Sequence, residues 1–364
     1  MCQSHHAVCF ILPPHIESKL AENPKYRDRA LRALQISERQ RGLRQGAPIL
    51  ALIGQAGPKH RTIFDAQHGT DLPGVKVRDE NDGPVGDVAV NQAFDFCGDT
   101  YDFYLKVFDR NSVDDHGLLL KSSVHYDEGY NNAFWNGHQM IYGDGDQELF
   151  QNFTSSVDVI GHELTHGVTQ NEAQLVYQDQ PGALNESMSD VFGSLVKQWV
   201  NDQTADKADW LIGEGLFTPA VHGKALRSMK EPGTAYDDPN LGKDPQPGHM
   251  NDFVNTRSDN GGVHINSGIP NKAFFLAATK IGGFAWQKAG LIWYRTLTSS
   301  LRPTANFQAA ADATVAAAAG LFGDNSEEQK AVIEAWREVG LIPKTIAPGA
   351  VKAPAKSKST RAAA

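Results

Sequence analysis

Apolar and polar residues follow two patterns along the chain, and one replaces the other near residue 156. Residues 75–155 are rich in Tyr, Phe, Val, Gly, Asn and Asp and contain turn signals such as Asn136-Gly137, which predicts a twisted antiparallel sheet. Beyond this point the apolar residues recur at helical spacing. The predicted helices cover 157–170, 184–200, 271–280, 286–299, 307–320 and 326–339. We therefore predict an α+β protein with a mostly β N-terminal lobe at 75–155 and a mostly α-helical C-terminal lobe at 156–342.

The N-terminal part of the chain has a pattern of its own. An apolar run at 8–12 precedes Pro13-Pro14, and 16–44 has the pattern of one charged amphipathic helix. The apolar positions of this predicted helix are Leu20, Leu31, Leu34 and Ile36. Residues 47–74 hold Gly, Pro and Ala with little periodicity, which is typical of a linker. We therefore treat residues 1–46 as a separate head.

Charge is distributed as unevenly as hydrophobicity. The 364 residues carry a net charge of −9, but the head holds eight Lys or Arg and four Asp or Glu, so its charge is +4 and that of the remainder is −13. Residues 343–364 contain five Lys or Arg and no acid, which predicts a disordered basic tail. An acidic body argues against nucleic acid or an anionic membrane as the main partner. No apolar run has the length or flanking charges of a secretory signal or a membrane span. We expect the protein to be a monomer.

His162-Glu163-Leu164-Thr165-His166 is an HExxH motif inside the first predicted helix. With this composition we expect roughly 0.02 such motifs per chain by chance, so incidental histidines on an amphipathic helix are a poor explanation. Residues four apart lie on one helix face, so both imidazoles can reach one Zn²⁺, while Glu163 can address a water molecule. A purely structural zinc site would need a fourth protein ligand, usually Cys, and none lies nearby in the sequence.

The next predicted helix offers a third ligand for a catalytic zinc. Glu186 lies beyond a Pro181-Gly182 turn that can fold this helix back against the first. Asp190 follows one turn later and can accept the free ring N–H of a ligand histidine. The residues after His166 contain no further Gly and His of the metzincin kind, so we disfavour that class of zinc protease.

Five blocks of sequence resemble the thermolysin family of zinc endopeptidases, and they occur in family order across about residues 85–340. The blocks are Asn132-Ala133-Phe134-Trp135-Asn136-Gly137, His162 to His166, Gly182-Ala183-Leu184-Asn185-Glu186, Leu226-Arg227-Ser228-Met229 and residues 259–268. The short cationic head with Pro13-Pro14 resembles the protealysin-like branch, in which a short propeptide occupies and silences the active-site cleft until it is cut. The resemblance implies the two-lobed fold with the zinc helix at the junction of the lobes.

The resemblance also implies a role for each matching residue. His162, His166 and Glu186 would bind one zinc ion, and Glu163 would be the general base and proton shuttle. Tyr177 and His264 would face the tetrahedral oxyanion, with Asp259 bonded to His264 and raising its pKa. The remaining implied residues bind the peptide backbone (Asn132, the Ala133 carbonyl and Arg227) or support the zinc ligands (Asn185 and Asp190).

The substrate preference rests on an apolar pocket that the family uses for the residue after the scissile bond. The matching positions are Phe150, Phe153, Val159, Ile212 and Leu226, each of which also suits ordinary core packing. We expect cleavage of proteins or peptides before bulky hydrophobic residues.

The head and linker raise three further expectations. Residues 1–46 would be the inhibitory propeptide, and cleavage within 42–59 would release the mature enzyme. Cys9 could cap the zinc, or residues 8–16 could cover the cleft without touching it. The family is mostly secreted, whereas this chain shows no Sec leader, so cytoplasmic accumulation with leaderless release is the alternative.

One departure from the family concerns calcium. Asp158, Asp209 and Glu214 match a carboxylate cluster that binds calcium in thermolysin, but Lys197 and Leu211 stand where two more carboxylates are expected. In a further calcium loop Lys224 replaces an Asp. Because Ca²⁺ needs several oxygen ligands, we predict reduced or absent calcium sites.

Two function classes remain at this point. The first is an active zinc metalloendopeptidase made as a self-inhibited zymogen. The second is a catalytically inactive thermolysin-like protein that only binds its targets.

Overall fold

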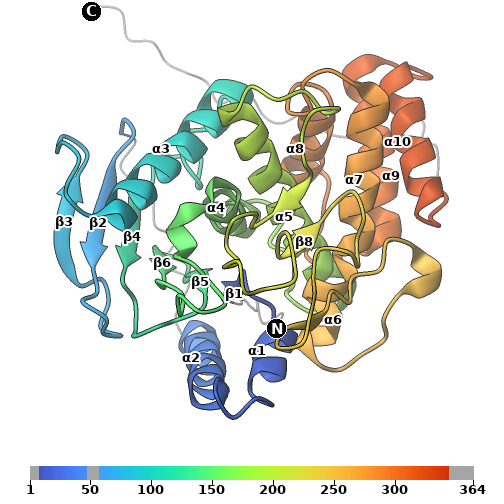
Figure 1. The fold of residues 1–364 in the computed structure, drawn as a ribbon. Coiled ribbons are helices and arrows are strands. Elements are labelled where there is room, and N and C mark those ends of the chain that lie inside the picture. Colours follow the sequence, from blue (N-terminus) through green and yellow to red (C-terminus); the bar gives the residue numbers. More distant parts are fainter. Residues whose placement is uncertain (1–7, 47–56, 344–364) are drawn as a thin grey trace, which may run out of the picture.

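The computed structural model describes residues 8–46 and 57–343, and the tail predicted at 343–364 lies almost entirely outside them. A six-stranded sheet of order β1-β5-β6-β4-β2-β3 forms one side of the molecule (Figure 1). The strands are β1 (Cys9–Phe10), β2 (Arg61–Asp65), β3 (Val75–Asp79), β4 (Leu120–Val124), β5 (Ala133–Trp135) and β6 (Met140–Tyr142). The β-rich N-terminal lobe of the predicted α+β fold is therefore confirmed.

Three details of the predicted sheet were wrong. The sheet is mixed, because β4 pairs in parallel with both β2 and β6. Strand β2 lies within the segment predicted as linker, and Ile63 on it is buried in the core. The N-terminal lobe also contains a long helix, α3 (Val88–Phe108), in a stretch whose aromatic and β-branched residues suggested strands.

The sequence does carry a signal for helix α3. Its N-cap is Asp87, whose carboxylate accepts hydrogen bonds from the Ala89 and Val90 backbone N–H groups at 2.8 and 3.3 Å. Its buried residues recur at helical spacing, among them Ala93, Phe94 and Cys97. Packing of this face against the sheet outweighs the weak helix propensity of the residues.

The C-terminal lobe is helical, as predicted, and lies opposite the sheet with α4 and α5 between them (Figure 1). The helices are α4 (Val157–Asn171), α5 (Asp179–Val200), α6 (Asp259–Asn266), α7 (Gly268–Ile281), α8 (Ala289–Ser299), α9 (Phe307–Phe322) and α10 (Glu327–Glu338). Short elements connect them: η1 (Phe153–Ser155), β7 (Leu211–Ile212), β8 (Arg227–Ser228), β9 (Asp237–Asp238), β10 (Gly242–Lys243) and η2 (Met250–Asp252). The sequence pattern did not predict α6, and the expected Pro181-Gly182 turn is the first turn of α5.

The head forms two helices instead of the single helix predicted, α1 (Pro14–Leu20) and α2 (Arg27–Gly46). The break contains Pro24, which cannot continue a helix. The break also changes which side of α2 faces inward: Ala30 and Ala33 are buried, whereas Leu31 is 44% exposed. Both helices lie beside β1 and the rest of the molecule, which we call the body (Figure 1).

Opposite charges join α2 to the body. Arg29 forms an ion pair with Asp146 at 3.0 Å, and Arg32 forms another with Asp127. Both carboxylates are almost fully buried, so the cationic head complements an acidic surface. In the part of the chain that the structure describes, no helix is both long and apolar enough to cross a membrane.

Close packing of α4 on α5 sets the geometry of the site. A Cβ atom on Gly193 would lie 2.4 Å from the Asp158 carbonyl oxygen and 3.0 Å from the His162 backbone nitrogen. A Cβ atom on Gly161 would lie 3.1 Å from the Gly193 Cα. The two helices therefore approach as closely as they do because neither glycine carries a side chain.

Candidate active site

Two histidines on consecutive turns of α4 face a glutamate on α5. The Nε2 atoms of His162 and His166 lie 3.0 Å apart. Glu186 Oε2 lies 3.5 Å from His162 Nε2, and Glu186 Oε1 lies 3.5 Å from His166 Nε2. All three side chains are buried. The structure thus brings together the three residues predicted as metal ligands.

The other ring nitrogen of each histidine is engaged in a hydrogen bond. His162 Nδ1 donates to Asp190 Oδ1 at 2.8 Å, and His166 Nδ1 donates to Asn185 Oδ1 at 2.8 Å. Donation from Nδ1 leaves a lone pair on each Nε2, so two lone pairs face each other. This arrangement is unfavourable unless a cation joins the nitrogens, and Zn²⁺ binds imidazole nitrogen at about 2.0–2.1 Å. The donor set therefore fits one zinc ion.

Glu163 lies beside this cluster with one oxygen held and the other unpaired. Its Oε2 accepts a hydrogen bond from the Trp135 backbone N–H at 2.9 Å. Its Oε1 is buried and has no hydrogen-bond partner among the residues that the structure describes. Burial, reinforced by the Glu186 carboxylate, raises the pKa of Glu163 well above its usual range. A carboxyl group with a raised pKa is suited to taking up and returning a proton.

Tyr177, His264 and Asp259 form a chain of polar contacts that ends at Glu186. The Tyr177 hydroxyl donates to Glu186 Oε1 and lies 3.2 Å from His264 Nε2. His264 Nδ1 donates to Asp259 Oδ1 at 2.6 Å. Burial by itself lowers the pKa of His264, but Asp259 and Glu186 outweigh it and raise the pKa to about 8. The imidazole is therefore suited to donating a hydrogen bond from Nε2 at neutral pH.

A tight turn at the start of α6 holds this pair. Asp259, Asn260, Gly261 and Gly262 all have positive φ angles, which is unfavourable for side-chain-bearing residues. A Cβ atom on Gly261 would lie 2.1 Å from an Asp179 carboxylate oxygen. The turn brings Asp259 Oδ2 to 2.9 Å from the His264 backbone N–H, so one carboxylate binds both the backbone and the ring.

Arg227 on β8 is buried against Asp190 on α5. Its Nε and Nη2 atoms donate to the two carboxylate oxygens at 2.9 Å each, a bidentate geometry. Burial by itself raises the pKa of an acid, but Arg227 and His162 hold the pKa of Asp190 well below its usual range. Asp190 therefore joins His162, a predicted zinc ligand, to Arg227, and Asn271 is the third residue that donates to it, through Nδ2 at 2.8 Å.

The head occupies the surface formed by these residues. Strand β1 pairs antiparallel with β5, with Cys9 opposite Trp135 and Phe10 opposite Phe134. His264 Nε2 donates to the Phe10 carbonyl at 3.0 Å, and Arg227 Nη1 donates to the Ile11 carbonyl at 3.0 Å.

Two further bonds hold the next residues of the head. The Ile11 N–H donates to the Ala133 carbonyl at 3.1 Å, and the Leu12 N–H donates to Asn132 Oδ1 at 2.9 Å. Every residue predicted to bind a peptide backbone therefore contacts the backbone of the head.

The five residues predicted to form the apolar pocket are all buried. They are Phe150, Phe153, Val159, Ile212 and Leu226, and they belong to the same hydrophobic cluster as Ile11 and Leu12 of the head. Phe150 and Phe153 stack with ring centroids 6.0 Å apart.

Two supporting residues were missed by sequence reasoning. Ser189 Oγ lies 3.0 Å from His166 Nδ1, and Asn271 binds Asp190 as described above. Ser189 could have been found, because it lies one residue before Asp190 on the helix that supplies Glu186. Asn271 gave no local signal, since it lies on α7, far along the chain from the residues it contacts.

Comparison with known proteins agrees with this geometry. The family model described as thermolysin metallopeptidase, catalytic domain, matches residues 56–170, and that described as thermolysin metallopeptidase, alpha-helical domain, matches residues 173–341. An extracellular metalloprotease of Pectobacterium carotovorum subsp. carotovorum is 49% identical over 343 residues, which cover 92% of this chain and 96% of that protein. Protease PrtS of Photorhabdus sp. (strain Az29) is 55% identical over 285 residues, 78% of this chain and 76% of that protein.

A solved structure is similar along nearly the same length. It is the precursor of protealysin, a metalloproteinase from Serratia proteamaculans, with a TM-score of 0.84 and 51% sequence identity. The match covers 92% of this chain and 99% of that one. This chain therefore belongs to the thermolysin family of zinc metallopeptidases.

Proposed function

We propose that this zinc endopeptidase is made as a self-inhibited precursor and becomes active when residues 1–46 are removed. The observation that carries the proposal is the set of hydrogen bonds between the head backbone at 10–12 and four residues of the body. These four are Asn132, Ala133, Arg227 and His264. A peptide substrate would need the same donors and acceptors, so the head and a substrate exclude each other. Residues 47–56, within the proposed cleavage region, lie outside the described part of the chain.

The geometry supports separate roles for the metal-binding residues and for Glu163. His162, His166 and Glu186 hold the zinc, which when bound supplies a Lewis acid and lowers the pKa of water. Glu163 takes a proton from the attacking water and returns it to the leaving amine, with the Trp135 N–H orienting its carboxylate.

The remaining polar groups stabilise charge and position the substrate. Tyr177 and His264 donate hydrogen bonds to the developing oxyanion, and Asp259 keeps His264 cationic near neutral pH. Asn132, the Ala133 carbonyl and Arg227 hold the substrate backbone. Asn185 and Asp190 fix the ring orientations of the zinc-ligand histidines.

We propose that the substrate side chain after the scissile bond is bulky and hydrophobic. Residues 150, 153, 159, 212 and 226 offer it only aromatic and aliphatic surface. A charged side chain placed there would lose its hydration without gaining a partner. Digestion of a peptide library tests this specificity, and a preference for charged residues at that position would contradict it.

We propose further that calcium sites are reduced or absent, because a lysine supplies the cation in their place. Lys197 Nζ lies 3.0 Å from Asp158 Oδ2 and 2.9 Å from Asp209 Oδ1, and it donates to the Leu211 carbonyl at 2.8 Å.

We also propose that the protein is a monomer and that it is released to the outside of the cell. The relative from Pectobacterium is named an extracellular metalloprotease.

Casein hydrolysis by the processed protein tests the function. We expect activity that a zinc chelator abolishes, that added Zn²⁺ restores, and that Glu163→Ala loses. The matched control is Glu334→Ala, because Glu334 is 60% exposed on α10 and pairs only loosely with Lys280 at 3.4 Å. Processed protein that retains zinc yet never cleaves casein or peptides would instead identify a catalytically inactive binding protein.

The role of the head is tested separately. Uncut precursor should hydrolyse the same peptides far more slowly than the processed protein, with both samples carrying one zinc per chain. Equal rates would contradict self-inhibition and leave the endopeptidase assignment intact.

A further inference from the structure

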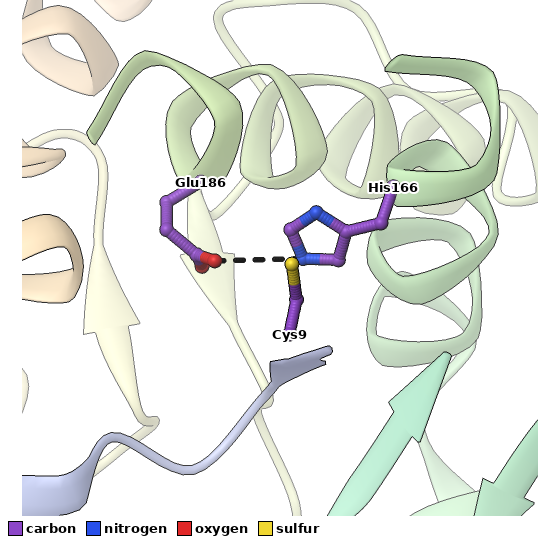
Figure 2. Close-up of side chains that lie close together, drawn as sticks. All are labelled: Cys9, His166 and Glu186. Atoms are coloured by element: carbon purple, nitrogen blue, oxygen red, sulfur yellow. Dashed lines mark ion pairs between the residues drawn. The ribbon is translucent and has the colours of Figure 1, made fainter. Parts of the chain in front are cut away.

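The thiol of Cys9 lies among the proposed zinc ligands. Ligand atoms of Cys9, His166 and Glu186 all lie within 4.8 Å of one another, and all three residues are buried. Figure 2 shows the sulfur of Cys9, on the head, in front of the His166 ring and close to the Glu186 carboxylate. His162 adjoins this group, since its Nε2 is 3.0 Å from His166 Nε2. Three potential zinc ligands, one of them from the head, therefore lie together, and His162 adjoins them through its contacts with His166 and Glu186.

The register of β1 places the sulfur there. Cys9 pairs with Trp135, whose backbone N–H binds Glu163, so this pair lies directly beside the zinc helix. Adjacent residues of a strand point to opposite faces. Phe10 accordingly points away and packs on Phe134, with ring centroids 4.9 Å apart, while Cys9 packs with Tyr177 and Val263. A slip of one residue would exchange the thiol for a phenyl ring.

The neighbouring bonds prevent such a slip. The Phe10 carbonyl, the Ile11 carbonyl and the Leu12 N–H bind side chains from different elements of the body, namely His264 on α6, Arg227 on β8 and Asn132 just before β5. Because the three bonds come from three different elements, the strand cannot slide along its length without breaking all of them. The sulfur is thus held in place by contacts that do not involve the metal.

The chemistry of the cluster suits a thiolate at this position. Zinc in a catalytic site keeps three protein ligands and one open position, whereas a closed site has four protein ligands and commonly includes Cys. Thiolate is a soft ligand that zinc binds well. Two anionic ligands, Glu186 and a Cys9 thiolate, would balance the 2+ charge of the ion in a buried site.

We propose that the Cys9 thiolate is the fourth zinc ligand of the precursor, so that the head closes the metal site itself as well as the substrate cleft. The proposal rests on the proposed zinc site and names how that site is regulated. When the S–Zn bond forms, the thiol proton passes to solvent. When the head departs, the S–Zn bond breaks, the sulfur takes up a proton, and the fourth position opens to solvent. No oxidant or reductant takes part.

Cobalt substitution of the full-length precursor tests the proposal without an activity assay. Co²⁺ replaces Zn²⁺ in such sites, and a bound thiolate gives it an intense near-ultraviolet charge-transfer band. We expect this band in the wild-type precursor and its loss in Cys9→Ser. Cys97→Ser and Cys2→Ser are the controls and should keep the band: Cys97 is buried in the core beside Ser122, and Cys2 lies outside the described residues.

The possible results separate this proposal from the zinc site on which it rests. One cobalt per chain without the band overturns thiolate ligation and leaves the three-ligand site standing. A band that survives Cys9→Ser but disappears in Cys2→Ser also overturns the assignment of Cys9. Failure of the wild-type precursor to bind cobalt at all overturns both.

Zinc affinity gives a second measurement. We expect the dissociation constant of the precursor to rise by about tenfold or more in Cys9→Ser, because one of four protein ligands is lost. The serine keeps nearly the same shape, so the head should remain bound in the cleft. Processed wild-type protein, which lacks Cys9, should match the Cys9→Ser precursor. Equal affinities for the wild-type and Cys9→Ser precursors would show that Cys9 only packs against the site.

Discussion

Helices α4 and α5 carry two charge clusters side by side, one fully buried and one partly exposed, and the clusters obtain their cation in different ways. The zinc cluster comprises the three proposed ligands His162, His166 and Glu186, whose facing atoms are all acceptors. The lysine cluster comprises Asp158 and Asp209 with Lys197 between them. Asp158 lies one turn before His162 on the same face of α4, so the two clusters share one seam.

The difference lies in what completes each cluster. In the lysine cluster the chain supplies the positive charge, and although burial by itself lowers the pKa of an amine, Asp158 and Asp209 raise the pKa of Lys197 above its ordinary value. In the zinc cluster the lone pairs of His162 and His166 face each other, and an imported ion must join them. A tethered ammonium cannot leave and cannot polarise a substrate. The seam therefore combines a cation that is part of the chain, the Lys197 ammonium, with a metal ion that can exchange with solvent.

The largest effect is expected from Asp190→Asn, which tests whether the zinc cluster depends on its support. Asp190 binds both Arg227 and His162, so the change leaves the arginine buried without a counter-charge. We expect the free energy of unfolding of the metal-free protein to fall by about 4 kcal/mol. We also expect the affinity for zinc to become weaker by roughly 10–100-fold. Urea denaturation and zinc competition measure the two quantities.

Asp206→Asn is the control for this change, because Asp206 is 71% exposed and lies only 3.7 Å from an exposed Lys207. It should leave both quantities nearly unchanged. An Asp190→Asn protein as stable as the wild type would mean that Arg227 and His162 find other partners.

The second effect concerns the lysine cluster. Lys197→Glu replaces the buried cation with a further carboxylate beside Asp158, Asp209 and Glu214, which should cost about 3 kcal/mol in calcium-free buffer. Millimolar Ca²⁺ should then restore much of this loss, because carboxylate oxygens from Asp158, Asp209 and the new glutamate can bind the ion. Thermal unfolding with and without calcium measures the change. Lys197→Met is the control, since it should be destabilised without any rescue by calcium.

The two clusters also differ in how far the sequence could predict them. The HExxH motif and Glu186 were found because helical spacing and a family motif fix their positions locally. Lys197 was predicted to stand among carboxylates for the same reason, and it lies between Asp158 and Asp209. Residues that contact the site from distant elements carried no such signal, as Asn271 on α7 demonstrates.

Elements were missed where packing overrides local pattern. Helix α3 is built from residues that favour strands, and it forms because its buried face packs against the sheet. Strand β2 falls in the segment predicted as linker, because residues 47–74 hold Gly, Pro and Ala with little periodicity and the partner strand β4 lies elsewhere in the chain. The pairing of β1 with β5 could not be read from the sequence, since nothing in the residues specifies which strand the head would join.

A third change acts on both clusters at once. Gly193→Ala places a methyl group 2.4 Å from the Asp158 carbonyl oxygen, which forces α4 and α5 apart. We expect a loss of about 2 kcal/mol in the free energy of unfolding, together with weaker zinc binding. Gly320→Ala on α9 is the control, because its added carbon would meet nothing within 4 Å. It should stabilise the protein by about 0.5 kcal/mol, since alanine favours the helix. Unchanged zinc affinity in Gly193→Ala would show that the metal site tolerates a wider seam.

The smallest effect expected is that of calcium on the wild-type protein, and it tests directly whether the lysine has replaced the ion. Free Ca²⁺ at a concentration equal to its dissociation constant would add about 0.4 kcal/mol to the free energy of unfolding. This corresponds to about 1 °C in melting temperature for a protein of this size. We therefore expect millimolar Ca²⁺, or its removal with a calcium-selective chelator, to shift the melting temperature by no more than about 1 °C. Removal of zinc with a zinc-selective chelator should lower it by several times as much. A rise of many degrees with calcium would require oxygen ligands elsewhere, and would mean that the positive charge of Lys197 supplements bound calcium instead of replacing it.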